Sequence, residues 1–123
     1  MLTAEIEITA YHANVHFDNL VISTGSEETP SPFQLFLASL GACAGLNAAG
    51  YCENYGLPMQ GLKVIMNVER DPNTALASLI QMQLVLPPSF PEDRKTAILQ
   101  AADACFIKNH LATPPRFETT IVE

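Results

Sequence analysis

The chain has 123 residues, of which 48% are hydrophobic and 15% are charged, and its formal net charge at pH 7 is −7. This length predicts a single domain over residues 1–123 that is large enough for its own core. Its six Lys and Arg residues are too few for the clustered positive charge that nucleic acid or an anionic membrane surface requires. We therefore expect a neutral or apolar ligand, and neither a nucleic-acid partner nor a membrane partner.

The start of the chain and its cysteines bear on where the protein works. Residues 1–7 lack the basic n-region and the apolar h-region of a signal peptide, which predicts a cytoplasmic protein. Cys43, Cys52 and Cys105 form no Cys-x-x-Cys pair. They are too few and too scattered for a disulfide scaffold or a zinc site. We expect no metal and no cofactor, and any bond between two of these cysteines would be a redox event.

Three short strands are predicted near the N-terminus. Residues 2–9 alternate apolar and polar side chains, which is the period of a half-buried strand. A second strand follows over residues 12–17, and after a turn at Asp18–Asn19 a third covers residues 20–23. Three sequential short strands indicate an antiparallel meander.

The stretch from Ser31 to Gly56 predicts a long central helix. No residue between Glu28 and Glu53 is charged, and apolar side chains fall on all sides of such a helix, so it has to be buried. Ser31 and Gln34 form a capping box at its start, and Gly56 supplies its end. The stretch is also long enough to span a membrane. We expect a core helix instead, because polar residues interrupt it and the flanks have the pattern of amphipathic strands.

Small residues are concentrated in this predicted helix. Each glycine in a helix costs about 1 kcal/mol relative to alanine, which indicates that another backbone comes close. Gly41 and Gly45 are four residues apart, and the chain has no second long apolar helix. We therefore predict that the same helix of a second copy packs here, in an obligate homodimer.

The second half of the chain predicts a hairpin and two helices. Strands over residues 62–70 and 76–86 are joined by strong turn residues at Asp71–Thr74. A helix then opens with acidic residues in its first turn at Glu92–Asp93, and a shorter helix covers Cys105–His110.

A closing strand is predicted over residues 117–122, where side chains alternate after the double proline at residues 114–115. The predicted order of elements is therefore βββ-α-ββ-αα-β. This order is typical of an α+β fold.

Two patterns in the chain resemble the OsmC/Ohr family. The run Ser-Pro-x-x-Leu-x-Leu-Ala-Ser-Leu-Gly-Ala-Cys ends at Cys43, a second cysteine, Cys105, starts a short helix, and the order of elements agrees over nearly the whole chain. The resemblance implies an intertwined homodimer in which the two central helices pack together and sheets of both chains surround them. It also implies a thiol peroxidase site at the dimer interface that reduces organic hydroperoxides, with Cys43 as peroxidatic and Cys105 as resolving cysteine.

The chemistry that the resemblance implies suits these residue types. A thiolate attacks a peroxide oxygen and becomes a sulfenic acid, and a second thiol within reach captures it as a disulfide. A dithiol is the expected reductant.

Two positions differ from the family pattern. The peroxidases carry an acidic residue directly after the helix-opening proline and an arginine upstream, and the two hold the thiolate and orient the peroxide. Here Phe33 stands at the acidic position, and no arginine precedes Arg70. The candidates to supply the missing charges are His12, His16, Glu28 and Arg116. We expect Lys108 and His110, although near Cys105, to be surface residues.

The remaining candidate residues lie on the central helix. Cys52 is nine residues after Cys43, about 180° round the helix, which predicts a structural role. An apolar substrate pocket is expected at Phe33, Phe36 and Leu40.

Two interpretations of the function fit these patterns. The first is a redox protein that uses Cys43 and Cys105 on a small hydrophobic peroxide. The second is a non-catalytic dimer that binds a small apolar ligand in the cleft between its subunits. The second predicts slow, ordinary alkylation of Cys43 near neutral pH.

Overall fold

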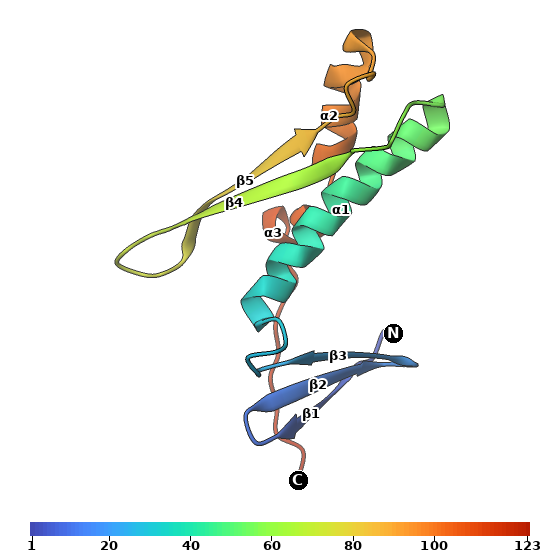
Figure 1. The fold of residues 1–123 in the computed structure, drawn as a ribbon. Coiled ribbons are helices and arrows are strands. Elements are labelled where there is room, and N and C mark those ends of the chain that lie inside the picture. Colours follow the sequence, from blue (N-terminus) through green and yellow to red (C-terminus); the bar gives the residue numbers. More distant parts are fainter. The chain divides into compact units, whose positions relative to one another are not determined.

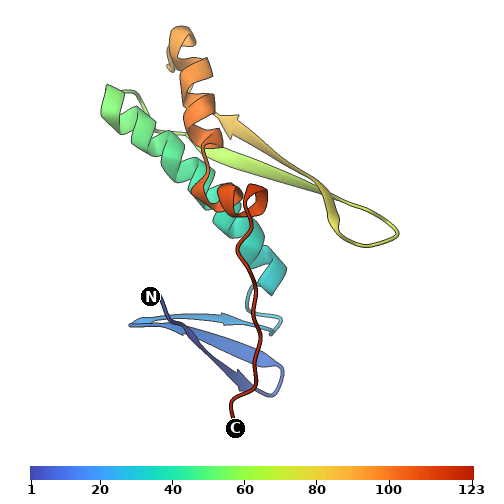
Figure 2. The ribbon, with the colours of Figure 1, turned by 180° about the vertical axis from the view of Figure 1, so that it is seen from behind.

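The computed structural model describes every residue from Met1 to Glu123. The chain forms two compact units, residues 1–38 and 39–123. Figures 1 and 2 show their helices and strands from opposite sides. One helix begins in the first unit and continues through the second.

The first unit contains the three predicted strands. They are β1 (Glu5–Thr9), β2 (His12–Phe17) and β3 (Leu20–Thr24), and they form an antiparallel sheet in the order β1-β2-β3 (Figure 1). Asp18 has a positive φ of 45° in the predicted turn between β2 and β3. The predicted meander is confirmed.

The loop after β3 depends on a glycine. Gly25 has φ of 103°, and a Cβ at this position would lie 2.3 Å from the backbone carbonyl oxygen of Tyr11. Any other residue would clash there and would also have to adopt a left-handed conformation. Next to it, the buried Thr24 donates a hydrogen bond through Oγ1 to the backbone carbonyl of Pro30. These two contacts fix the start of the loop that leads into the helix.

The central helix α1 covers Pro32–Tyr55, as predicted. Its capping box is formed: Gln34 N donates to Ser31 Oγ at 3.1 Å, and Ser31 N donates to Gln34 Oε1 at 2.9 Å. Gly56 follows the helix with φ of 62°, the conformation that commonly ends an α-helix.

Only one stripe of α1 is buried. It consists of residues spaced four apart, each 3% exposed or less: Leu40, Ala44, Ala48 and Cys52. Leu46 is 73% exposed, so the expected burial on all sides is not reached within one chain. The length and hydropathy of α1 would suffice for a membrane span, but core helices pass the same test, so this is weak evidence for one.

Two glycines of α1, Gly41 and Gly45, face the strand β4 (Lys63–Arg70) of the same chain. A Cβ at Gly41 would lie 3.2 Å from Met66 Cε, and a Cβ at Gly45 would lie 3.7 Å from Val64 Cγ2. The small residues let the side chains of a strand come close. Within one chain, no helix lies within 4 Å of a Cβ at either position. The expected packing of a second copy of α1 against these glycines stays a prediction.

The second unit is built on a hairpin of β4 and β5 (Ala77–Val85). The predicted turn is present, because the side chain of Asp71 accepts hydrogen bonds from the backbone N–H groups of Asn73 at 2.7 Å and Thr74 at 3.2 Å. Val64 pairs with Leu84 across the hairpin, and both are half-buried on the face that α1 covers. The predicted hairpin is confirmed.

The core of the second unit lies between α1 and α2 (Lys95–Asp103), which a short 3₁₀ turn at Glu92–Arg94 precedes. Figure 2 shows the two helices side by side. One cluster of buried residues joins the two helices and includes Phe90, which precedes α2 in the chain. Its members are Ala44, Ala48, Cys52, Phe90, Ile98 and Ala102. The small alanines of α1 allow α2 to approach closely.

The C-terminal part differs from the prediction. The short helix α3 is present at Phe106–Ala112, but residues 113–123 contain no strand. A strand needs a neighbouring strand for its backbone hydrogen bonds, and alternation in the sequence does not supply one. Phe117, Ile121 and Val122 are 84%, 88% and 93% exposed, so no sheet of this chain covers them. The predicted closing strand at residues 117–122 was wrong for the single chain.

Replacing Ile98 with alanine tests the core. Ile98 is fully buried, so Ile98→Ala should lower the free energy of unfolding by about 2–5 kcal/mol through lost burial and a cavity. The control is Leu99→Ala on the same helix, where the side chain is 57% exposed and the expected loss is about 1 kcal/mol or less. Equal losses in urea unfolding would contradict the described core.

Candidate functional site

The two candidate cysteines come from different elements of the second unit. Cys43 is half-buried on α1, directly before Ala44 of the buried stripe. Cys105 is 1% exposed and stands immediately before α3, where its Sγ accepts a hydrogen bond from the backbone N–H of Lys108 at 3.4 Å. In this cap position the sulfur takes the place that a serine or aspartate oxygen often has.

The structure brings these two cysteines together. The side chain of Cys105 is near enough to the Cys43 thiol to lower its pKa. Both are free thiols. A peroxidatic and a resolving cysteine have to be neighbours, because the sulfenic acid formed on one sulfur is captured by the other.

The surroundings of Cys43 favour its thiolate. The pKa of the Cys43 thiol is lowered from the ordinary value of 9.0, first by a hydrogen bond from the backbone N–H of Ile107 and then by the Cys105 side chain. Burial acts in the opposite direction. A hydrogen bond from the N–H of Phe106 and the positive charge of Lys108 lower the pKa further. The lowering therefore comes mainly from hydrogen bonds and only in part from a cation.

Lys108 is the cation that acts on Cys43. Its Nζ lies 2.5 Å from Asp103 Oδ1, and its side chain is 35% exposed. Lys108 was expected to be a surface residue; it is half-buried, and its charge has the smallest effect among the groups that act on the pKa of Cys43. The sequence carried no signal for it, because its effect depends on how α3 lies against α1. His110 is exposed, as expected, with Nδ1 2.9 Å from the carbonyl oxygen of Phe106.

A polar side chain of α1 holds the link between α2 and α3. Asn47 Nδ2 donates a hydrogen bond of 2.8 Å to the backbone carbonyl of Ala104. Ala104 directly precedes Cys105, and Asn47 is four residues after Cys43. In the sequence, Asn47 is one of the polar residues that interrupt the apolar run of α1. A polar residue one helical turn from a cysteine was the only available signal.

Cys52 belongs to the core and not to the site. It is fully buried, and burial raises the pKa of its thiol. Both observations agree with the predicted structural role.

The four residues proposed to supply charge lie elsewhere in the chain. His12 is exposed and His16 half-buried on β2, and Glu28 is exposed in the loop before α1. Arg116 is ion-paired with Glu118 at 3.1 Å, and its side chain is 86% exposed. None of the four is among the groups that shift the pKa of Cys43 within this chain. Their role stays a prediction.

The expected pocket residues lie on the first half of α1. The rings of Phe33 and Phe36 stack with centroids 6.0 Å apart, and Leu40 is 2% exposed. A substrate pocket at these residues stays a prediction.

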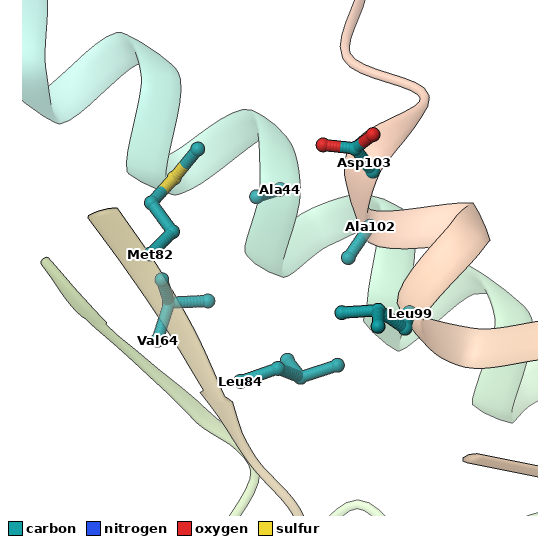
Figure 3. Close-up of a pocket in the computed structure, with 7 residues that line it drawn as sticks. All are labelled: Ala44, Val64, Met82, Leu84, Leu99, Ala102 and Asp103. Atoms are coloured by element: carbon teal, nitrogen blue, oxygen red, sulfur yellow. The ribbon is translucent and has the colours of Figure 1, made fainter. Parts of the chain in front are cut away.

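An apolar cavity of about 50 Å³ lies in the second unit. Figure 3 shows side chains of α1, the hairpin and α2 converging on it: Ala44, Val64, Met82, Leu84, Leu99, Ala102 and Asp103. Ala44 follows Cys43 in the chain, and Asp103 is the ion-pair partner of Lys108. The lining of the cavity is therefore apolar apart from Asp103, and neither Cys43 nor Cys105 is part of it. No cluster of three or more His, Cys, Asp or Glu side chains is placed to hold a metal ion.

The sequence profile of the OsmC-like protein family matches residues 25–120. The chain belongs to the OsmC-like family. The match includes α1, the hairpin and both cysteines, so the resemblance drawn from the Cys43 motif is confirmed. A comparison with curated proteins gave no match.

Solved structures share the fold of this OsmC-like protein. A hypothetical protein from Aquifex aeolicus VF5 has a TM-score of 0.77 at 15% identity, covering 93% of this chain and 89% of that one. An OsmC like protein from Mycoplasma pneumoniae has a TM-score of 0.75 at 13% identity, with 93% and 89% covered.

A third solved structure has a descriptive name. It is a protein from Psychrobacter arcticus 273-4 named for an osmotic stress induced and detoxification response, with a TM-score of 0.75 at 14% identity and 89% and 87% of the two chains covered. At these identities the likeness establishes the α+β fold alone.

The lowered pKa of Cys43 predicts how its alkylation depends on pH. Because the thiolate is favoured, the rate with iodoacetamide should rise with pH through a midpoint below 9.0, whereas buried Cys52 should stay unmodified in the folded protein. Lys108→Met should move the Cys43 midpoint upward. Lys95→Met is the control. It removes the lysine at the start of α2 that pairs with Glu92, and it should leave the midpoint of Cys43 alkylation unchanged. Mass spectrometry of the cysteine peptides measures each rate, and a Cys43 midpoint at or above 9.0 would contradict the described site.

Proposed function

We propose that this OsmC-like protein is a thiol peroxidase that reduces small hydrophobic organic hydroperoxides with Cys43 and Cys105. The observation that carries the proposal is the proximity of the Cys43 thiol and the Cys105 side chain. Two further features support it. The surroundings of Cys43 favour a thiolate, and the same unit holds an apolar cavity lined by Ala44, the residue after Cys43, and by Asp103, the ion-pair partner of Lys108. We place this reaction in the cytoplasm, without a nucleic-acid or membrane partner.

The proposed reaction has three steps. The Cys43 thiolate attacks the terminal oxygen of the hydroperoxide, the O–O bond breaks, and the alkoxide leaves and takes a proton, giving a sulfenic acid and an alcohol. The Cys105 thiol then attacks the Cys43 sulfur, which forms the disulfide and releases water. A dithiol supplies two electrons and two protons to restore both thiols, and is itself oxidised to a disulfide.

In this proposal the effect of the missing arginine on the thiol is supplied in part by three other groups. They are the Lys108 ammonium and the backbone N–H groups of Phe106 and Ile107. They lower the pKa of the Cys43 thiol. The nearest cation is itself paired with Asp103, so its charge is partly neutralised. We therefore expect activity at neutral pH that increases as the remaining Cys43 thiol ionises.

We also propose that the working form is a homodimer. The supporting observation is the uncovered side of α1, where an apolar groove of about 480 Å³ is lined mainly by small or aliphatic residues: Ala42, Gly45, Leu46, Ala49, Met59, Leu62, Lys63 and Val64. A second copy of α1 would cover Leu46, which is 73% exposed in the single chain. The uncovered apolar residues after α3 fit the same assembly, since a second chain could offer them a neighbouring strand.

Cysteine substitutions test the peroxidase proposal. Cys43→Ser should abolish consumption of cumene hydroperoxide in the presence of dithiothreitol, because the nucleophile is lost. Cys105→Ser should consume one equivalent without the reductant and leave a sulfenic acid that dimedone traps. Cys52→Ser is the control and should keep the wild-type rate if the protein stays folded.

Two results would overturn the peroxidase proposal. One is equal peroxide consumption by wild-type and Cys43→Ser protein. The other is no consumption by wild-type protein at any pH. The second result, together with slow and ordinary alkylation of Cys43, would favour the non-catalytic protein that binds an apolar ligand.

A charge on the uncovered side of α1 tests the dimer. Leu46→Glu should shift the protein from dimer to monomer in sedimentation velocity, because a carboxylate would be buried without a partner in the interface. Asn54→Glu, at an exposed position near the end of the same helix, should leave the dimer intact. A wild-type protein that sediments as a folded monomer would overturn the proposal directly.

A further inference from the structure

Asn47 connects the two parts of the chain that carry the candidate cysteines. It lies four residues after Cys43, so both side chains project from the same side of α1. Its Nδ2 donates 2.8 Å to the backbone carbonyl oxygen of Ala104, the residue before Cys105. The hydrogen bond therefore connects Asn47, one helical turn after Cys43, to the peptide group directly before Cys105.

The acceptor of this hydrogen bond is a helix end. Ala104 is the C-cap of α2, and its N–H is used in a bond of 3.1 Å to the carbonyl of Gln100. The last carbonyls of a helix have no partner within the helix and need one from outside. Asn47 provides that partner for Ala104 through an uncharged donor.

The link between α2 and α3 is short. Only Ala104 and Cys105 separate Asp103, the end of α2, from Phe106, the start of α3. Fixing the carbonyl of Ala104 also fixes the plane of the peptide bond to Cys105, because that bond is planar. The hydrogen bond from Asn47 therefore adds to the packing of α1 and α2 in fixing where the Cys105 sulfur lies relative to α1.

We propose that Asn47 is a positioning residue that holds Cys105 against Cys43 and so sets how readily the two thiols form a disulfide. This role rests on the proposed use of the two cysteines as a redox pair. In the step concerned, the two thiols lose two electrons and two protons and form one S–S bond. When oxidised glutathione is the oxidant, it takes up the two electrons and the two protons and becomes two molecules of reduced glutathione.

The test measures the disulfide equilibrium and does not depend on peroxide. Wild-type protein and variants are equilibrated with reduced and oxidised glutathione, quenched with acid and digested, and the Cys43–Cys105 disulfide is measured by mass spectrometry. The effective concentration of the two thiols follows from these amounts. Asn47→Leu keeps the size of the side chain and removes the donor. It should lower the effective concentration on the order of tenfold, as expected for loss of one hydrogen bond.

Two further variants make the result specific to Asn47. Asn47→Asp keeps the size and the polarity but presents no donor when ionised, so it should show a similar fall even if Asn47→Leu fails to fold. Asn54→Leu is the matched control, because Asn54 is exposed on α1 and lines a surface groove together with Asn47 and Ala104. It should leave the effective concentration within about twofold. The alkylation midpoint of Cys43 should move upward in both Asn47 variants and stay in place in Asn54→Leu, which a general loss of stability would not produce.

The results separate this inference from the peroxidase proposal. An unchanged effective concentration in the folded Asn47 variants would overturn the positioning role, and so would a wild-type protein that forms no Cys43–Cys105 disulfide in oxidised glutathione. A fall in the Asn47 variants alone supports it. If that fall occurs but wild-type protein consumes no hydroperoxide, the positioning role stands and the peroxidase proposal fails.

Discussion

The close packing of α1 against α2 is the constraint on which the candidate site depends. Ala44 and Ala48 keep one stripe of α1 small, and Ile98 and Ala102 of α2 are buried against it. Because α2 ends next to α1, the chain that leaves it has to pass Cys43 before it turns into α3. The proximity of the two thiols is thus a consequence of where two apolar faces meet.

The electrostatics of the site follow from the same packing. A buried thiol without partners has a raised pKa, as Cys52 has in the core. Cys43 lies only nine residues earlier on the same helix, yet its pKa is lowered, because backbone N–H groups of α3 and Cys105 reach it. Two cysteines of one apolar helix therefore differ in chemistry because of their neighbours. A charged side chain inside α1 itself is not required for this difference.

The sequence could predict what local signals specify. Three local signals were read correctly: the capping box at Ser31 and Gln34, the turn at Asp71, and the Cys43 motif. Each of them is contained in one short stretch of sequence. The roles of Asn47 and Lys108 could not be predicted, because they depend on contacts between distant parts of the chain. The strand at residues 117–122 failed for a related reason, since alternation describes a side-chain pattern and does not identify the neighbouring strand.

The lowered pKa of Cys43 also links its reactivity to the stability of the fold. A thiol whose pKa is lower in the folded than in the unfolded chain stabilises the fold at pH values above its unfolded pKa, and this contribution is lost as the pH falls through the folded pKa. The hydrogen bonds involved come from Ile107, Cys105 and Phe106, all in or next to α3. Ionisation of Cys43 therefore tightens the attachment of α3 to α1. Any change that weakens the attachment of α3 to α1 must in turn raise the pKa of the Cys43 thiol. The pKa of Cys43 and the stability of the α3 attachment therefore report on the same interaction.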